Sequence, residues 1–131
     1  MNTHYVLIDF ENVQPHNLTQ LQNPAFKVMV FVGDKQAKIA FELALAIQTL
    51  GERAEYIKIE GNGLNALDFH IAFYIGQLAG QNKQSHHIIS KDTGFDPLIR
   101  HLKGKNIIAE RREDIATLAA RSHLNPFTLL H

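Results

Sequence analysis

The sequence of 131 residues contains no cysteine. Disulfide bonds and cysteine-based zinc sites are therefore excluded, and an intracellular, cytoplasmic protein is the simpler expectation. No apolar run approaches the roughly 20 residues that a membrane-spanning helix needs, so we expect no membrane association. Residues 1–4 form no basic segment, and Asp9 and Glu11 interrupt the apolar run that follows. This start predicts no signal peptide.

The sequence also lacks a net charge, because 13 Lys and Arg balance 13 Asp and Glu. This balance argues against non-specific binding of nucleic acid over the whole surface. Residues 1–80 hold five basic and eight acidic side chains, whereas residues 81–131 hold eight and five. The basic residues of 81–131 would be able to bind a phosphate backbone beside an acidic site. On charge alone, however, we expect them to form a solvated face of the protein. They include Arg100, Lys103, Lys105, Arg111, Arg112 and Arg121.

Three common motifs for binding nucleotides, dinucleotides and zinc are missing as well. The sequence has no G-x-x-x-x-G-K-[ST] loop, and Gly61-Asn62-Gly63 lacks the third glycine of a dinucleotide-binding fingerprint. The eight histidines form no H-E-x-x-H or other zinc pattern. A Rossmann-type oxidoreductase is therefore poorly supported.

What the sequence does contain is an alternation of short, β-branched apolar runs with helix signals. We predict strands at 5–8, 27–32, 54–59, 86–90 and 107–109, and helices at 18–21, 36–50, 65–78, 97–104 and 115–122. Such alternation predicts a parallel sheet with right-handed crossovers, covered on both faces. Without repeats or linkers, we expect residues 1–131 to form one domain, a three-layer α/β sandwich around a mostly parallel five-stranded sheet.

Acidic side chains follow four of the apolar runs closely: Asp9, Asp34, Asp68 and Asp92. The carboxyl ends of parallel strands share one edge of the sheet, and ligands bind in the crevice there. Carboxylates that gather at such an edge raise one another's pKa, and divalent cations would relieve their repulsion. The sequence therefore predicts a metal-dependent enzyme.

Asp9 and Asp68 stand out from ordinary turn or surface acids. Glu11 and Asn12 follow Asp9 at once, and these three oxygen-bearing side chains exceed what a strand-ending turn requires. Asp68 lies in a mostly apolar helix, where a lone buried carboxylate is costly unless it is paired or binds a metal. Alternatively, Asp68 lies on a partly wet helix face and complements the helix dipole.

The most informative local string is Ser90–Leu98. Asp92 leaves the fourth predicted strand, and Gly94 permits a tight turn after it. Asp96 is a candidate metal ligand or, equally, the N-cap of the helix that begins at Pro97. Lys91 pairs with the acids or reaches a phosphate oxygen.

Three segments appear in the order typical of one family: Ile8–Val13, Asn65–Ala72 and Ile89–Leu98. In these motifs the chain resembles the PIN-like superfamily of nucleases, closest to its NYN branch, from residue 5 to about residue 102. The resemblance implies a three-layer α/β fold and a cluster of acids that binds Mg²⁺ or Mn²⁺ to hydrolyse RNA.

The resemblance also implies roles for individual residues in a metal-dependent ribonuclease, more specifically an endonuclease. Asp9, Asp68 and Asp92 match the family's acids, and we expect them to be catalytic residues and metal ligands. Asp96 is added as a candidate ligand. Asn12, Lys91, Arg111 and Arg112 are expected to bind the RNA substrate.

Two departures from the family pattern leave the metal count open. Gly94 stands where the branch often has a second Asp, and Glu42 only loosely matches a Glu of PIN toxins. One metal ion is expected, and Glu11, Asp34, Glu42 or Asp96 would have to complete a second site.

Two alternatives stay open: a non-catalytic PIN-like module with an incomplete acidic site, which binds RNA or a protein partner, and a small-molecule phosphohydrolase. A homodimer or a protein partner is compatible with each of these functions.

Overall fold

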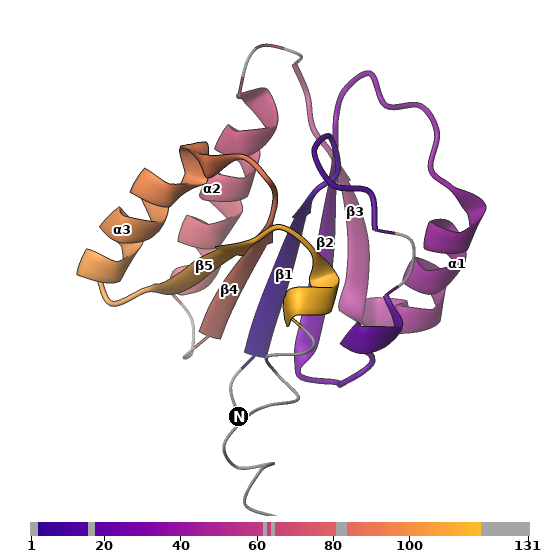
Figure 1. Cartoon of the computed structure of the whole chain (residues 1–131), viewed down its shortest axis with the longest axis horizontal. Coiled ribbons are helices and arrows are strands. Elements are labelled where there is room, and N and C mark those ends of the chain that lie inside the picture. The colour runs from indigo at the N-terminus through magenta and orange to yellow at the C-terminus, as the bar shows by residue number, and fades with distance from the viewer. Residues whose placement is uncertain (1–2, 16–17, 62, 64, 81–83, 119–131) are drawn as a thin grey trace, which may run out of the picture.

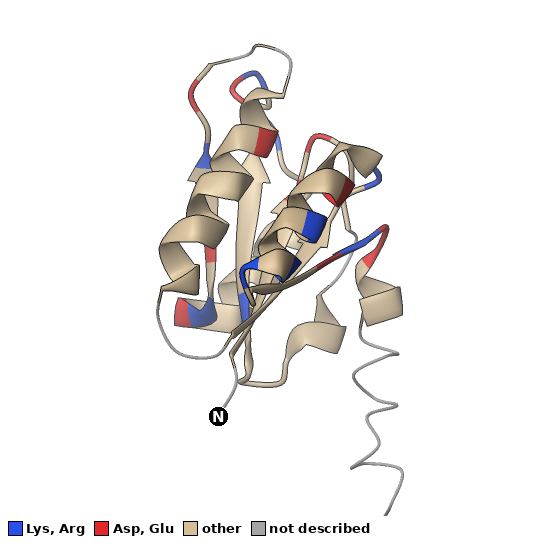
Figure 2. Cartoon of the chain, turned by 90° about the vertical axis from the view of Figure 1, so that its left-hand side faces the viewer, with Lys and Arg blue, Asp and Glu red and all other residues tan. Residues whose placement is uncertain are grey.

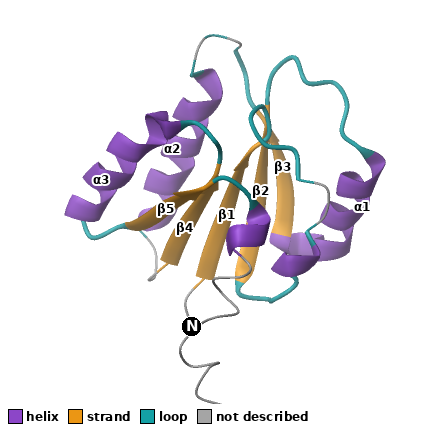
Figure 3. Cartoon of the chain, in the orientation of Figure 1, coloured by secondary structure: helices purple, strands orange, loops and turns teal. Residues whose placement is uncertain are grey.

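The computed structural model describes residues 3–15, 18–61, 63, 65–80 and 84–118. Its centre is an all-parallel sheet of five strands in the order β3-β2-β1-β4-β5 (Figure 1). The strands are β1 (Thr3–Asp9), β2 (Phe26–Val32), β3 (Ala54–Lys58), β4 (Gln84–Ile89) and β5 (Ile108–Arg112). This sheet, with helices on both faces, is the predicted three-layer α/β fold (Figure 3).

Helices form the two outer layers. They are α1 (Phe41–Leu50), α2 (Ala66–Ala79) and α3 (Asp96–Gly104), with 3₁₀ turns η1 (Thr19–Leu21), η2 (Gly51–Arg53) and η3 (Thr93–Phe95). One core cluster joins α1 and residues 115 and 118 to one face of the sheet, and a second joins α2 and α3 to the other. Among the described residues, no helix is long and apolar enough to cross a membrane.

Successive side chains of β1 point to opposite faces of the sheet, and both sets are apolar, so both faces must be covered. Val6 and Ile8 belong to the core beneath α1, whereas Tyr5 and Leu7 belong to the core beneath α2. All four side chains are buried, so the strand reads as a continuous apolar run, as expected for a central parallel strand. Asp9, which follows them, lies on the α2 side by the same alternation.

One helix is shorter than the sequence predicts. Instead of starting near Gln36, α1 begins at Phe41. Gln36 Oε1 accepts a 2.7 Å hydrogen bond from Gly33 N, and Gln36 Nε2 donates to Phe10 O. Lys58 Nζ donates to Gly33 O and Gln36 O. These contacts hold the segment after β2 in a turn, and most of them come from residues distant in sequence.

Other boundaries also differ from prediction. Asp96 is the first residue of α3 and not its N-cap, because its carboxylate binds Arg111. β5 runs to Arg112, beyond the predicted end at residue 109, because Glu110 and Arg111 find partners on β4 and α3. The predicted helix 18–21 is the 3₁₀ turn η1. Of the predicted helix 115–122, residues 115–118 are helical and the remainder lies outside the described residues.

Candidate active site

Asp9 is the last residue of β1 and is only 1% exposed. Its Oδ2 accepts hydrogen bonds of 2.7 Å from both Asn12 Nδ2 and Ser90 Oγ. Its backbone carbonyl accepts from the N–H groups of Asn12 and Val13 and closes the turn after the strand. A buried carboxylate needs such donors, and here they also fix its orientation.

Ser90 connects Asp9 to the loop that carries Asp92. Its side chain is fully buried, and its hydroxyl accepts a 3.0 Å hydrogen bond from Asp92 N while donating to Asp9. Asp92 Oδ1 in turn accepts from Gly94 N at 2.8 Å and caps η3. Sequence reasoning missed the role of Ser90, although a serine at the end of an apolar strand, two residues before an aspartate, was a usable signal.

Gly94 lies unusually close to Asp92. A Cβ atom at position 94 would be 2.9 Å from Asp92 Oδ1, closer than real Cβ contacts allow. Any side chain there would therefore displace the carboxylate of Asp92. Gly94, the residue that departs from the family pattern, thus leaves room for the observed position of the Asp92 carboxylate.

Asp68 lies in the first turn of α2 and is partly buried. Burial, a hydrogen bond with Asp92 and the negative charges of Asp92, Asp9 and Glu11 raise the pKa of Asp68 to about 7. The structure thus brings Asp68 into contact with Asp92 and places Asp9 and Glu11 within electrostatic reach. Figure 2 shows acidic positions at the starts of α2 and α3 and in several loops near the end of the molecule where the strands end.

The chemistry of these donors can be compared with the needs of a divalent cation. Among the described residues, no group of three or more Asp, Glu or His side chains has the arrangement of a metal-ion site. The donor atoms are nevertheless the oxygens that Mg²⁺ and Mn²⁺ prefer. Asp68, with a pKa of about 7, also retains a proton near neutral pH that a bound cation would displace. By their chemistry alone, these donors therefore suit a hard cation.

Glu11 is exposed beside these acids and lies directly over Gly33. A Cβ atom at position 33 would be 2.1 Å from Glu11 Oε2, so a side chain there would displace this carboxylate. Asp34, the next residue, is exposed in the turn after β2, and Glu42 is exposed on α1 in the opposite layer from Asp68.

Arg111 and Asp96 form an ion pair at the side of the site. Arg111 Nε donates to Asp96 Oδ1 at 2.9 Å, and Arg111 Nη1 donates to the carbonyl of Ser90 at 3.1 Å. The hydrogen bond from Arg111 lowers the pKa of Asp96. A metal ion would have to compete with Arg111 for this carboxylate, and a phosphate would have to compete with Asp96 for this guanidinium.

Arg112 belongs to a different network on β5. Its Nε donates to Glu110 Oε2 at 3.2 Å, and the same oxygen lies 2.5 Å from His87 Nδ1. His87 Nε2 lies 2.9 Å from His4 Nδ1, so the network crosses β1, β4 and β5. The side chain of Arg112 is only 13% exposed. Contact with RNA would therefore require Arg112 to leave this network.

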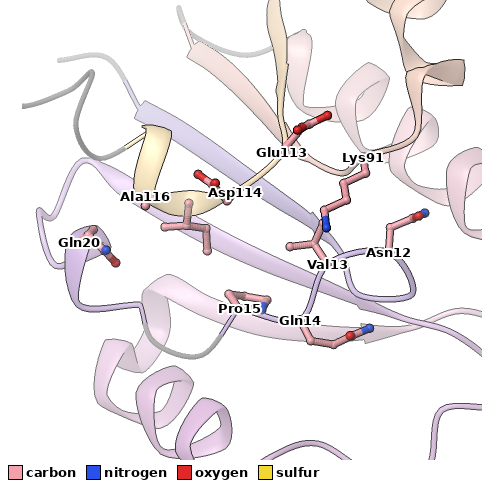
Figure 4. Close-up of a pocket in the computed structure, with 10 residues that line it drawn as sticks. Asn12, Val13, Gln14, Pro15, Gln20, Lys91, Glu113, Asp114 and Ala116 are labelled. Carbon is pink, nitrogen blue, oxygen red and sulfur yellow. The ribbon is translucent and has the colours of Figure 1, made fainter.

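A pocket of about 660 Å³ lies next to the acidic residues (Figure 4). It contains Asn12 and Lys91, two of the residues predicted to bind substrate. Its lining consists of Asn12, Val13, Gln14, Pro15, Gln20, Lys91, Glu113, Asp114, Ile115 and Ala116.

Comparison with known proteins supports the family and the fold of the chain. No curated protein and no solved structure matches the chain. The chain does match the PIN domain family over residues 3–112, a span that includes all five strands and every acidic residue described above except Glu113 and Asp114. The match does not specify the NYN branch. PIN domains are generally nucleases that typically use divalent metals, and this chain belongs to the PIN domain family.

Proposed function

We propose that the chain is a metal-dependent ribonuclease of the NYN branch that cleaves RNA as a cytoplasmic endonuclease. The observation that carries this proposal is the convergence of acids on Asp68, which shares a hydrogen bond with Asp92 and lies within electrostatic reach of Asp9 and Glu11. Burial and these acids raise the pKa of Asp68 to about 7. Strongly perturbed carboxyl groups at the carboxyl edge of a parallel sheet are typical of functional sites. Membership of the PIN domain family supports the same activity.

In this proposal Asp9, Asp68 and Asp92 hold Mg²⁺ or Mn²⁺. When bound, such an ion supplies activated water and neutralises charge that develops on the phosphate. Through its two hydrogen bonds, Ser90 fixes the position of the Asp9 carboxylate relative to the backbone of Asp92. Asn12 restrains the same Asp9 oxygen from the opposite side of the loop. The protein thus orients its carboxylates before a ligand arrives.

Substrate contact is assigned to the exposed residues beside the acids. Asn12 and Lys91 are exposed, and Lys91 provides a positive charge for a phosphate oxygen. Roles for Arg111 and Arg112 in RNA binding stay predictions, since each guanidinium now binds a carboxylate. Their more immediate role is to hold β5 and the start of α3 in place.

A second candidate function is a PIN domain that binds RNA without cleaving it. The observation that favours it is the arrangement of the described acidic and histidine side chains, none of which form a closed metal-ion site. Gly94, which stands where the branch often carries a further acid, points the same way. The two functions differ in their need for a metal ion.

Labelled single-stranded RNA, incubated with purified protein and either manganese or chelator, separates the two functions. The ribonuclease proposal expects cleavage that chelator abolishes and that Asp92→Asn lowers at least about 100-fold, the scale of losing one electrostatic contact in a transition state. Glu52→Gln is the control, because Glu52 is an exposed carboxylate in η2, before β3 and away from the carboxyl edge. RNA binding without cleavage would favour the second function, and equal cleavage by wild type and Asp92→Asn would identify a contaminant.

A further inference from the structure

Helix α2 turns two phenylalanines to solvent. Phe69 is 70% exposed, and Phe73, one turn further along the helix, is 61% exposed. A surface helix usually presents charged side chains to water, yet Asp68 is the only Lys, Arg, Asp or Glu within α2 (Figure 2). Neighbouring large apolar side chains on a face without charges mark a surface that another molecule covers.

Phe69 lies directly beside the acidic residues. Successive residues of an α-helix are about 100° apart around its axis and only about 1.5 Å apart along it. Leu67 packs in the core, Asp68 shares a hydrogen bond with Asp92, and Phe69 follows on the solvent side. Helical side chains also tilt toward the start of their helix, and α2 starts at the end of the molecule where the strands end (Figure 1). The ring of Phe69 therefore lies at the outer rim of the acidic site.

Other aromatic rings in this region are already occupied. Phe10 and Phe95 are 3% and 2% exposed and belong to the two core clusters. Phe73 meets Tyr74 edge-on, with ring centroids 5.3 Å apart. Among the described residues, no aromatic ring contact involves Phe69. The ring of Phe69 is therefore open to an aromatic ligand.

The size of this surface decides between a protein partner and a smaller ligand. The exposed parts of Phe69 and Phe73 amount to roughly 250 Å², since an aromatic side chain has about 150–250 Å² to bury. A stable protein interface needs about 800 Å² from each partner. One nucleobase, in contrast, needs only a single aromatic ring on which to stack. The surface therefore matches a base better than it matches a second copy of the chain.

We propose that Phe69 stacks on a nucleobase of the RNA, next to the phosphate that lies at the acidic residues. The proposal rests on the ribonuclease function proposed above, because it needs a phosphate held at Asp68 and Asp92. Every base has a π-face, so this contact tolerates any sequence. It favours unpaired bases, because a base inside a duplex is stacked on its neighbours and cannot reach the ring.

Labelled hexauridylate and an abasic hexamer with the same phosphates are the probes. Because both carry the same charge, they differ only in the contacts of their bases. Binding is measured by fluorescence anisotropy in calcium, which takes oxygen ligands as Mg²⁺ does, and gels check that the RNA stays intact. We expect Phe69→Ala to weaken binding of hexauridylate about tenfold, the scale of one base–aromatic stack, and to leave binding of the abasic hexamer unchanged.

Phe41→Ala is the matched control. Phe41 is 77% exposed and is the first residue of α1, in the opposite layer from Asp68, so its removal should change neither affinity. Both variants replace an exposed phenylalanine with the residue of highest helix propensity, so both are expected to fold.

A second measurement needs no variant. Adenosine 5′-monophosphate has no bond between nucleotides that could be cleaved. Added to the wild-type chain with magnesium, its purine ring should shift the ring-proton resonances of Phe69 upfield, as stacking requires, and leave those of Phe41 unchanged.

Equal binding of hexauridylate by wild type and Phe69→Ala would overturn the stacking contact even if manganese-dependent cleavage is observed. An equal loss with the abasic hexamer would also overturn it, because the loss would not come from a base. A wild-type dimer that Phe69→Ala dissolves, detected by light scattering without RNA, would assign this surface to a second copy instead. A loss confined to hexauridylate, without any cleavage by wild type, would retain the stacking contact and refute the ribonuclease.

Discussion

At the scale of single residues, the surroundings of Asp68 would suit a bound cation but disfavour a negative charge when no cation is present. Its carboxyl group faces other negative charges and is partly withdrawn from water, so its ionised form is disfavoured. The protonated carboxyl group is compatible with the folded protein, because the proton neutralises the charge that a bound cation would otherwise neutralise.

The first prediction concerns the pH dependence of stability in the absence of metal. The pKa of Asp68 is about 7 in the folded protein, against 3.8 as a model value. The folded state therefore holds this proton more tightly, and its contribution to stability is fully present below about pH 4 and lost as pH rises to about 7. We expect Asp68→Asn to flatten the fall in melting temperature over this window, and parallel curves for wild type and variant would contradict it.

The second prediction concerns Ser90, whose hydroxyl has two partners in a fully buried position. Ser90→Ala leaves Asp92 N without this acceptor and removes one donor from Asp9. The expected loss in the free energy of unfolding is about 1–3 kcal/mol, measured by urea denaturation. Ser85→Ala, a serine within β4 that is only partly buried, is the control and should cost less.

At the scale of elements, β5 depends on charged contacts more than the other strands do. Its residues Glu110, Arg111 and Arg112 are partly exposed, and all three carry ion pairs to other side chains. The network through His87 and His4 connects this edge strand to β4 and β1. Side-chain contacts thus add to the backbone hydrogen bonds on this side of the sheet.

The third prediction tests this network. Burial favours a higher pKa for Glu110, but hydrogen bonds with His87 and Arg112 outweigh it and lower the pKa to about 2. The stabilisation is therefore present above about pH 4.5 and is lost as pH falls toward 2. We expect Glu110→Gln to reduce the free energy of unfolding at pH 7 by about 1–3 kcal/mol and to weaken its acid dependence. Glu55→Gln, an exposed change on β3, is the control for chemical denaturation across this pH range.

The elements themselves could be predicted from sequence because their signals are local. Apolar runs located all five strands, and the position of Asp9 and Asp92 just after two of these runs predicted the sheet edge at which they lie. The start of α1 was misplaced because Lys58 and Phe10, both distant in sequence, hold Gln36 in a turn. The ion pair between Asp96 and Arg111 was missed for the same reason, since it forms only after β5 joins the sheet.

At the scale of the whole molecule, a bound cation would stabilise the folded state by mass action. The fourth prediction is a gain of about 2.7 kcal/mol at a hundredfold excess of Mn²⁺ over its dissociation constant. Asp9→Asn should reduce this gain, and Glu52→Gln should not. Thermal melts with and without manganese measure it, and a melting temperature indifferent to millimolar manganese would contradict a metal site.

The position of β1 at the centre of the sheet also bears on how the chain folds. β1 pairs with β2, which follows it closely, and with β4, whose end holds Ser90, 81 residues beyond Asp9. Contacts of such long range carry a loop-closure cost and form slowly. During synthesis, the carboxylate of Asp9 has no serine partner until β4 has been made and has docked. The candidate active site therefore cannot be complete before β4 has joined the sheet, and a partly folded chain without β4 holds no organised acidic site.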